Sequence, residues 1–166
     1  MIANNEVLHV NPENGKVSTR IELDFEATDF SQSPCFRFLA VAGDGAVLMN
    51  TISGRPIAKM ERCHAVAYLD DGLIATGGDK ILIYDVRKMS PLYTFEALNP
   101  IRSISLTKKH TVFASSHNCV TVFDSTFSQR QDISVFGQIA GVAVGDRMHV
   151  FIDDKYACVA EYEWDT

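Results

Sequence analysis

The residues best able to bind a metal or to perform catalysis are scattered along this chain. Its five histidines stand at positions 9, 64, 110, 117 and 149, and no two of them have the close spacing of metal ligands. The four cysteines, at positions 35, 63, 119 and 158, also form no close pair of the kind found in zinc sites or redox motifs. We therefore expect no metal site and no cofactor.

Carboxylates are a second set of candidate catalytic residues. Asp44, Asp79 and Asp154 occupy recurring turn positions, which leaves open a small hydrolase or lyase with these acids on one rim. Solvated turn residues explain the same recurrence, because Asp is favoured in turns. The sequence contains no nucleophile elbow, zinc-protease motif or phosphate-binding loop. These observations predict a protein that is not an enzyme.

The composition predicts one folded domain over residues 1–166 and restricts its partners. The chain is 46% hydrophobic and 22% charged, which is enough apolar material for a core without disulfides or metals. Its 15 basic and 21 acidic residues give a net charge of -6, which argues against nucleic acid and anionic membranes as partners. We see no secretion signal and no membrane-spanning apolar run, so we expect an intracellular protein, cytoplasmic or nuclear, with reduced thiols.

Short apolar runs separated by Gly, Asp or Asn predict successive antiparallel hairpins and an all-β fold. The paired runs are residues 36–41 with 46–49, 73–76 with 81–84, 111–114 with 120–123, and 150–152 with 156–159. Further strands are expected at residues 16–23, 65–68, 92–95, 101–106, 133–136 and 139–144.

The turns recur at a regular interval, which predicts a repeat architecture. The intervals of 39, 35, 39 and 36 residues separate Asn5, Asp44, Asp79, Asn118 and Asp154. Six positions beyond the first four turns, Asn or Asp recurs as Asn11, Asn50, Asp85 and Asp124, whereas the fifth unit has Ala160. Four strands in a unit of about 35 to 41 residues fit a β-propeller blade.

Segment 81–84 is apolar on both faces, as expected for a middle strand that lies between two neighbouring blades. A β-sandwich with irregular strands is the alternative, although it does not explain the regular turn spacing.

Residues 64–85 resemble one repeat of the WD-repeat β-propeller family. The matching positions are His64 for the loop histidine, Thr76 for the strand hydroxyl, Asp79 for the turn aspartate and Tyr84 for the tryptophan of the closing dipeptide. The resemblance implies that these four side chains form a structural hydrogen-bonded chain across the blade. Because Tyr84 replaces tryptophan, the last hydrogen bond of the series would be made by a phenol hydroxyl in place of an indole N–H.

The other units resemble the family more weakly. Met49-Asn50 and Phe123-Asp124 stand at the position of the closing dipeptide, and residues 30–34 resemble the loop between the first two strands of a blade. Trp164-Asp165 has the letters of the dipeptide but lies too far beyond its turn, so we interpret it as a chance match.

The length predicts only part of a ring. Family members commonly close about seven blades, and 166 residues supply about four to five four-stranded blades. We expect a partial ring, a fragment or an arc that other protein subunits or a second copy complete; a small closed ring is the alternative. An open arc is expected to expose apolar blade faces at both ends.

These features favour a non-catalytic protein-interaction scaffold, one WD-repeat-like subunit of a larger intracellular assembly. Arg62, Arg87 and Lys88 are possible protein-binding residues because they lie near loops of the clearest blade. Recognition of a basic or modified-lysine peptide in the central channel is an alternative function, as is the small hydrolase or lyase.

Overall fold

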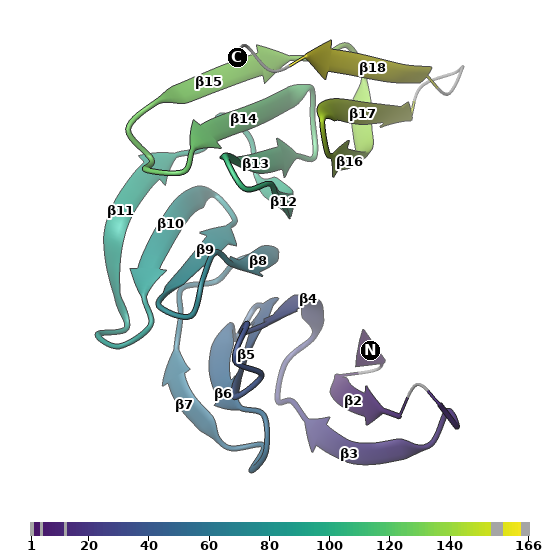
Figure 1. The fold of residues 1–166 in the computed structure, drawn as a ribbon, viewed down its shortest axis with the longest axis vertical. Coiled ribbons are helices and arrows are strands. Elements are labelled where there is room, and N and C mark those ends of the chain that lie inside the picture. The colour runs from purple at the N-terminus through teal and green to yellow at the C-terminus, as the bar shows by residue number, and fades with distance from the viewer. Residues whose placement is uncertain (1, 4, 12, 154–157, 164–166) are drawn as a thin grey trace.

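The computed structural model of the chain consists of antiparallel sheets arranged in an arc (Figure 1). The structure describes residues 2–3, 5–11, 13–153 and 158–163. These residues form five sheets, of which the second, third and fourth have four strands and the first and last have three. Blade-like, four-stranded antiparallel sheets confirm the predicted fold class.

Each sheet is built from consecutive strands. The first sheet contains β1 (Ile2–Ala3), β2 (Glu6–Val10) and β3 (Val17–Glu22). The second contains β4 (Ala27–Gln32), β5 (Phe38–Gly43), β6 (Val47–Asn50) and β7 (Pro56–Lys59). The third contains β8 (Ala65–Tyr68), β9 (Leu73–Gly77), β10 (Lys80–Asp85) and β11 (Ser90–Glu96). The fourth contains β12 (Ile101–Leu106), β13 (His110–Ser115), β14 (Cys119–Asp124) and β15 (Arg130–Ser134). The last contains β16 (Gln138–Val144), β17 (Arg147–Asp153) and β18 (Cys158–Glu163).

Strand position within the arc explains the sequence patterns. Strands β4, β8, β12 and β16 lie on the inner side of the arc and contact one another in turn, whereas β3, β7, β11 and β15 lie on the outer side (Figure 1). Middle strands such as β10 and β14 are buried almost throughout because sheets cover both of their faces. The outer β11 is mostly exposed.

Three local expectations were wrong. Residues 30–32 belong to β4, so the family-like loop is confined to the turn that follows this strand. Strand β7 was not anticipated, because Pro-Ile-Ala-Lys contains no apolar run. Phe136 does not extend β15; its side chain is 94% exposed in the connection to β16.

The first four recurring turns join the paired strands of their sheets. Asn5 and Asn118 adopt positive φ angles of 64° and 37°, which an asparagine tolerates. Gly43 precedes Asp44 with a φ of 156°, and a Cβ there would lie 2.3 Å from the carbonyl oxygen of Glu26. The fifth predicted turn, at Asp154, lies outside the described residues, as does Trp164-Asp165.

The second recurring set of Asn and Asp residues caps the turn that leads to each outer strand. The Oδ1 atom of Asn11 accepts the N–H of Glu13 at 2.8 Å, and that of Asn50 accepts the N–H of Ser53 at 2.9 Å. The bonds of the other two members are Asp85 Oδ1 with the N–H of Arg87 at 2.8 Å and Asp124 Oδ1 with the N–H of Gln129 at 2.9 Å. Ala160 instead lies within β18.

Four apolar cores join the five sheets, one core between each neighbouring pair. Val41 and Met49 belong to the first core, and Leu48 and Leu82 belong to the second. The third contains Ile83, Phe113 and Phe123, and the fourth contains Val120, Met148 and Val150. A sheet within the arc therefore contributes to two cores, whereas each end sheet contributes to one.

Polar side chains also join the inner strands of the second and third sheets. Asp29 Oδ2 accepts the N–H of Val66 at 3.0 Å, and Ser31 Oγ accepts the N–H of Tyr68 at 2.9 Å. These side chains accept hydrogen bonds from backbone N–H groups of β8. The N–H groups lie along the edge of β8 that has no strand partner within its own sheet.

Candidate functional site

Two of the four side chains expected to form a network across the third sheet are buried and hydrogen-bonded. The hydroxyl of Thr76, on β9, donates to the carbonyl oxygen of Leu82 at 3.5 Å. The hydroxyl of Tyr84, on β10, accepts the N–H of Glu61 at 3.3 Å and so connects the sheet to the segment before β8. Burial raises the pKa of the Tyr84 phenol, so it remains protonated at neutral pH.

The other two lie near the start of β8 and in the β9–β10 turn. The backbone N–H of His64 donates to the carbonyl oxygen of Gly77 at 2.7 Å, while Asp79 is exposed. Burial lowers the pKa of His64, as do the positive charges of Arg102 and Arg62. Among the described residues, no hydrogen bond joins any two of the four side chains, so the complete network stays a prediction.

The three possible protein-binding residues lie at opposite ends of the third sheet. We call the end that carries the β5–β6, β9–β10 and β13–β14 turns the first rim, and the opposite end the second rim. Arg62 lies on the first rim, where its Nε is 2.7 Å from Asp44 Oδ1. Arg87 and Lys88 are exposed in the β10–β11 turn on the second rim. The three residues therefore cannot form one continuous patch, and their binding role stays a prediction.

The four thiols are free, and two of them are buried. Burial raises the pKa of Cys63 to about 12, so this thiol acts as a small apolar residue. Cys35 and Cys158 are exposed, which the apolar sequence around them did not predict. Within the described residues, no group of three or more His, Cys, Asp or Glu side chains is placed to hold a metal.

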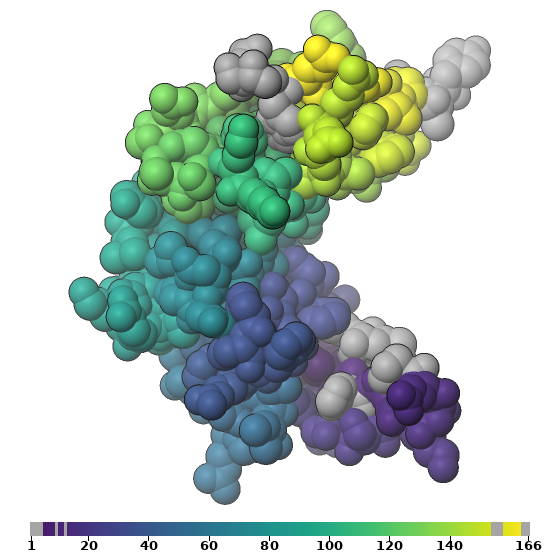
Figure 2. All heavy atoms as spheres, viewed as in Figure 1, coloured from purple at the N-terminus to yellow at the C-terminus, as the bar shows by residue number. Residues whose placement is uncertain are grey.

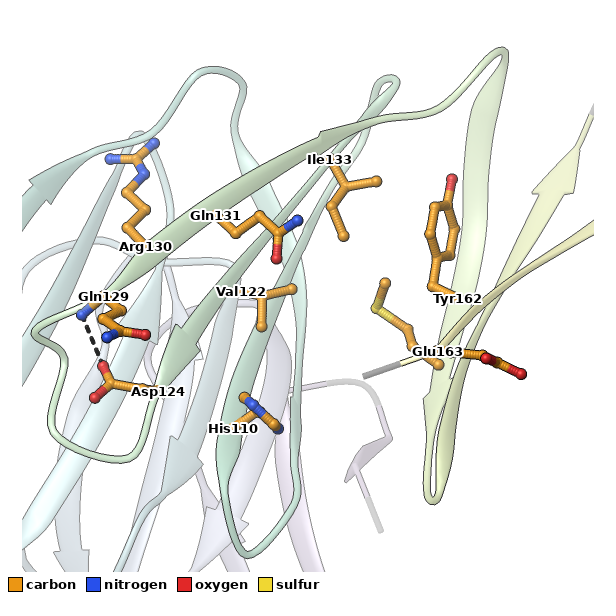
Figure 3. A pocket seen from close by; sticks show the side chains of 10 residues that line it. His110, Val122, Asp124, Gln129, Arg130, Gln131, Ile133, Tyr162 and Glu163 are labelled. Carbon is orange, nitrogen blue, oxygen red and sulfur yellow. Dashed lines mark hydrogen bonds between the residues drawn. The ribbon is translucent and has the colours of Figure 1, made fainter. Parts of the chain in front are cut away.

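A cavity of about 380 Å³ lies between the outer parts of the fourth and last sheets (Figure 3). Val122 and Ile133 line one side, and Met148 and Tyr162 line the other. Asp124 lies at one end, where the hydroxyl of Thr126, the N–H of Gln129 and the hydroxyl of Ser128 hold its pKa far below its usual range. This cavity was not predicted from the sequence.

The free face of the last sheet is less apolar than expected. Met148, Val150 and Ile152 point into the fourth core, so the alternating residues of β17 face away from it. On that face, Arg147 forms ion pairs with Glu161 and Glu163. Phe151 and Val159 are the apolar exceptions, directly opposite each other on β17 and β18.

The free face of the first sheet is also charged. Val7 and Ile21 contribute to the first core, while Glu6 and Arg20 lie on the alternate positions and form an ion pair with a 3.3 Å separation. The expectation of apolar end faces was therefore wrong for most of both surfaces. Figure 2 shows the two end sheets separated by a wide opening in the arc.

Comparisons with known proteins identify the fold. No family model matches the sequence, and no curated protein matches it. Among solved structures, the chain is similar to U3-55K with a TM-score of 0.80 at 12% sequence identity, over 93% of this chain and 54% of that one. It is similar to the RRP9 WD40 repeats with a TM-score of 0.80 at 12% identity, over 93% of this chain and 53% of that one.

The geometry and these comparisons agree on the architecture. A succession of four-stranded antiparallel sheets with a core between each pair is the arrangement of propeller blades. At 12% identity the likeness shows the fold alone. The chain has the WD40-repeat β-propeller fold, as a partial propeller that spans about half the length of the WD40 structures it matches.

Proposed function

We propose that this chain is a non-catalytic protein-interaction scaffold, a partial WD40-type propeller that another protein chain completes within a larger intracellular assembly. One observation carries the proposal: five sheets share four cores, so the first and last sheets each have a face without a neighbouring blade in the described structure. In a closed ring every blade packs against two others.

The strand content of the end sheets specifies what the completing chain would supply. In the described residues, the last sheet has no fourth strand beyond β18, and the first sheet has only the two-residue β1 on the inner side of β2. Completion would therefore add one outer strand beside β18 and one inner strand beside β1. Exposed strand edges of this kind accept a strand from a partner.

The free face of the last sheet favours a partner whose surface has both apolar and charged side chains. Phe151 and Val159 offer an apolar centre, and Arg147 with its two glutamates offers a charged border. Apolar centres with polar rims are typical of protein–protein interfaces. The blades that complete the ring would come from a different subunit, from a second copy of this chain or from a further part of the same protein.

Other partner classes receive less support. The net charge of -6 argues against nucleic acid, and this exclusion stays a prediction. No helix in the described part of the chain is long and apolar enough to cross a membrane. Residence in the cytoplasm or nucleus stays a prediction as well.

The alternative of a hydrolase or lyase has no observation in its favour. The carboxylate of Asp44 is already paired with Arg62, and Asp154 lies outside the described residues. Recognition of a basic or modified-lysine peptide in the central channel is the other alternative, and it stays a prediction.

The test is the solution mass of the purified chain, alone and after co-expression with candidate subunits, by light scattering behind size exclusion. We expect a defined complex of the chain with a partner. Phe151→Glu should abolish that complex, whereas Tyr93→Glu should not, because the two side chains are 43% and 45% exposed but Tyr93 lies on the outer strand β11. A stable 18.4 kDa monomer that forms no complex would contradict the proposal.

A further inference from the structure

An apolar cavity of about 310 Å³ lies between the first and second sheets. Val7, Val10 and Ile21 line it from the first sheet, and Phe30 and Leu39 line it from the second. Cavities of this size that are mostly apolar and have a few polar groups are typical of ligand sites.

One polar group in the lining of this cavity has no partner. The hydroxyl oxygen of Thr51 is buried and makes no hydrogen bond within the described part of the chain. A buried hydroxyl without a partner is costly, so a water molecule or a polar group of a ligand is expected to satisfy it. Gln32, which is exposed, is a second polar residue of the lining.

Two turns of the second rim flank the cavity. The β4–β5 turn follows Gln32 and the β6–β7 turn contains Thr51, and the N–H of Thr51 donates to the carbonyl oxygen of Arg37 at 2.9 Å. These turns present Phe36 and Ile52, which are 71% and 85% exposed. Apolar side chains this exposed on rigid turns are typical anchors for a partner.

The turn that presents Phe36 is held in an unfavourable conformation. Phe36 has a φ of 59°, which is rare and unfavourable for a large side chain. Its N–H donates to the carbonyl oxygen of Ser33 at 2.9 Å, and the N–H of Cys35 donates to Asp71 Oδ1 at 2.9 Å. The surrounding structure therefore fixes an exposed aromatic ring at this rim.

Two basic side chains lie on the turns that flank the cavity, where Asp71 is also in contact with the β4–β5 turn. Arg37 and Arg55 are exposed on the two turns, and neither forms an ion pair with a described residue. By contrast, Arg62 and Arg147 on other surfaces pair with carboxylates. Two unpaired guanidinium groups favour an acidic ligand.

We propose that this cavity and its two flanking turns bind an acidic peptide segment of a partner protein, which inserts one bulky apolar side chain between the first and second sheets. The inserted residue would contact Val10, Ile21 and Leu39, a polar group of the segment would reach the hydroxyl of Thr51, and flanking carboxylates would pair with Arg37 and Arg55. The inference rests on the proposed scaffold function and adds a binding site separate from the end face at Phe151.

The test is a nuclear magnetic resonance titration of the methyl-labelled chain with the peptide acetyl-Glu-Phe-Glu-amide at millimolar concentration. We expect saturable shifts of the methyl groups of Val10, Ile21 and Leu39. The double variant R37E/R55E should weaken binding by about tenfold or more, because it replaces two attractions with two repulsions. Replacement of both peptide glutamates by lysine should have a comparable effect.

Matched variants separate the site from the rest of the surface. Gln32→Trp should abolish binding, because the indole would fill the mouth of the cavity. Phe136→Ser, on the first rim, should leave binding unchanged. Absence of shifts at the cavity methyl groups, or equal binding by the wild type and R37E/R55E, would overturn the proposal.

The same titration on Phe151→Glu distinguishes this site from ring completion. If that variant loses the co-expressed partner but binds the peptide, the two sites are independent. If the wild type completes a ring but shows no shifts at the cavity, the peptide site is wrong and the scaffold function stands.

Discussion

The core between the third and fourth sheets and the free face of the last sheet are built from the same strand alternation, but they have opposite chemistry. In the core, Phe113 and Phe123 are fully buried, with ring centroids 5.7 Å apart in an edge-to-face contact. On the free face, Arg147 pairs with two glutamates, and Phe151 remains partly exposed. The comparison teaches that apolar burial joins the blades, whereas the ends of the arc are charged surfaces compatible with water.

The largest effect is expected from a truncation in the core. Phe123→Ala removes a ring that contacts Phe95 at a centroid distance of 4.6 Å as well as Phe113. Such a cavity should lower the free energy of unfolding by about 3–5 kcal/mol. Urea denaturation followed by circular dichroism measures the change.

The matched control is the same truncation on the free face. Phe151→Ala should cost about 1 kcal/mol or less, because much of its ring is already in contact with water. Equal losses for the two variants would show that the free face is covered in solution, for example by a second copy, and the comparison would fail.

A smaller effect is expected where polar side chains replace apolar packing between blades. Asp29→Ala leaves the buried N–H of Val66 without its acceptor, so the free energy of unfolding should fall by about 1–3 kcal/mol. Asp29→Asn keeps a carbonyl oxygen at that place and should retain most of the stability at neutral pH.

The pH dependence of this pair of variants is a further check. Burial raises the pKa of Asp29 above the ordinary value of 3.8, so the folded state binds the proton more tightly than the unfolded state. The cost of burying the charge is present above the raised pKa and is relieved as pH falls through it. Unfolding measured at falling pH should therefore show this gain in stability in the wild type and not in Asp29→Asn. Identical dependences of stability on pH in the two proteins would contradict the raised pKa of Asp29.

The turn cap of the fourth sheet has the opposite pH dependence. The hydroxyls and N–H group around Asp124 lower its pKa, so its contribution to stability is present above pH 4 and is lost as pH falls toward the lowered value. In Asp124→Asn, stability should fall less steeply as the pH is lowered below 4. Because Asp124 is only partly buried, we expect a modest effect, measured by thermal unfolding at several pH values. If the variant lost stability at acid pH as steeply as the wild type, the Asp124 carboxylate would not stabilise this turn.

The features that the sequence predicted correctly are local. Hairpin turns need Asn, Asp or Gly at fixed places, so their spacing revealed the blades. The recurrence of the second set was visible in the sequence, but its role in capping turns was found only in the structure. Val150 and Phe151 are adjacent apolar residues, yet one enters a core and the other does not. The sequence alone could not tell them apart, because the answer depends on which face of the sheet has a neighbour.

The candidate sites were less predictable for the same reason. The cavity beside Thr51 arises where two sheets separate, and neither sheet alone encodes it. Arg62 was identified as a candidate by its place in a loop, but its pairing with Asp44 links segments of two different sheets. Contacts between blades thus decide which exposed-looking residues are available to a partner.

The smallest effect is expected from Arg147→Ala on the free face. Exposed ion pairs contribute little to stability, since solvent screens them and ordering the side chains costs entropy. Unfolding in urea should therefore change only slightly, and the difference should vanish at high salt. Binding of a completing partner should respond more strongly, because Glu161 and Glu163 lose their counter-ion beside Phe151. A large, salt-insensitive loss of stability in the isolated chain would instead mean that this face is buried, and would remove the distinction between the ends of the arc and its cores.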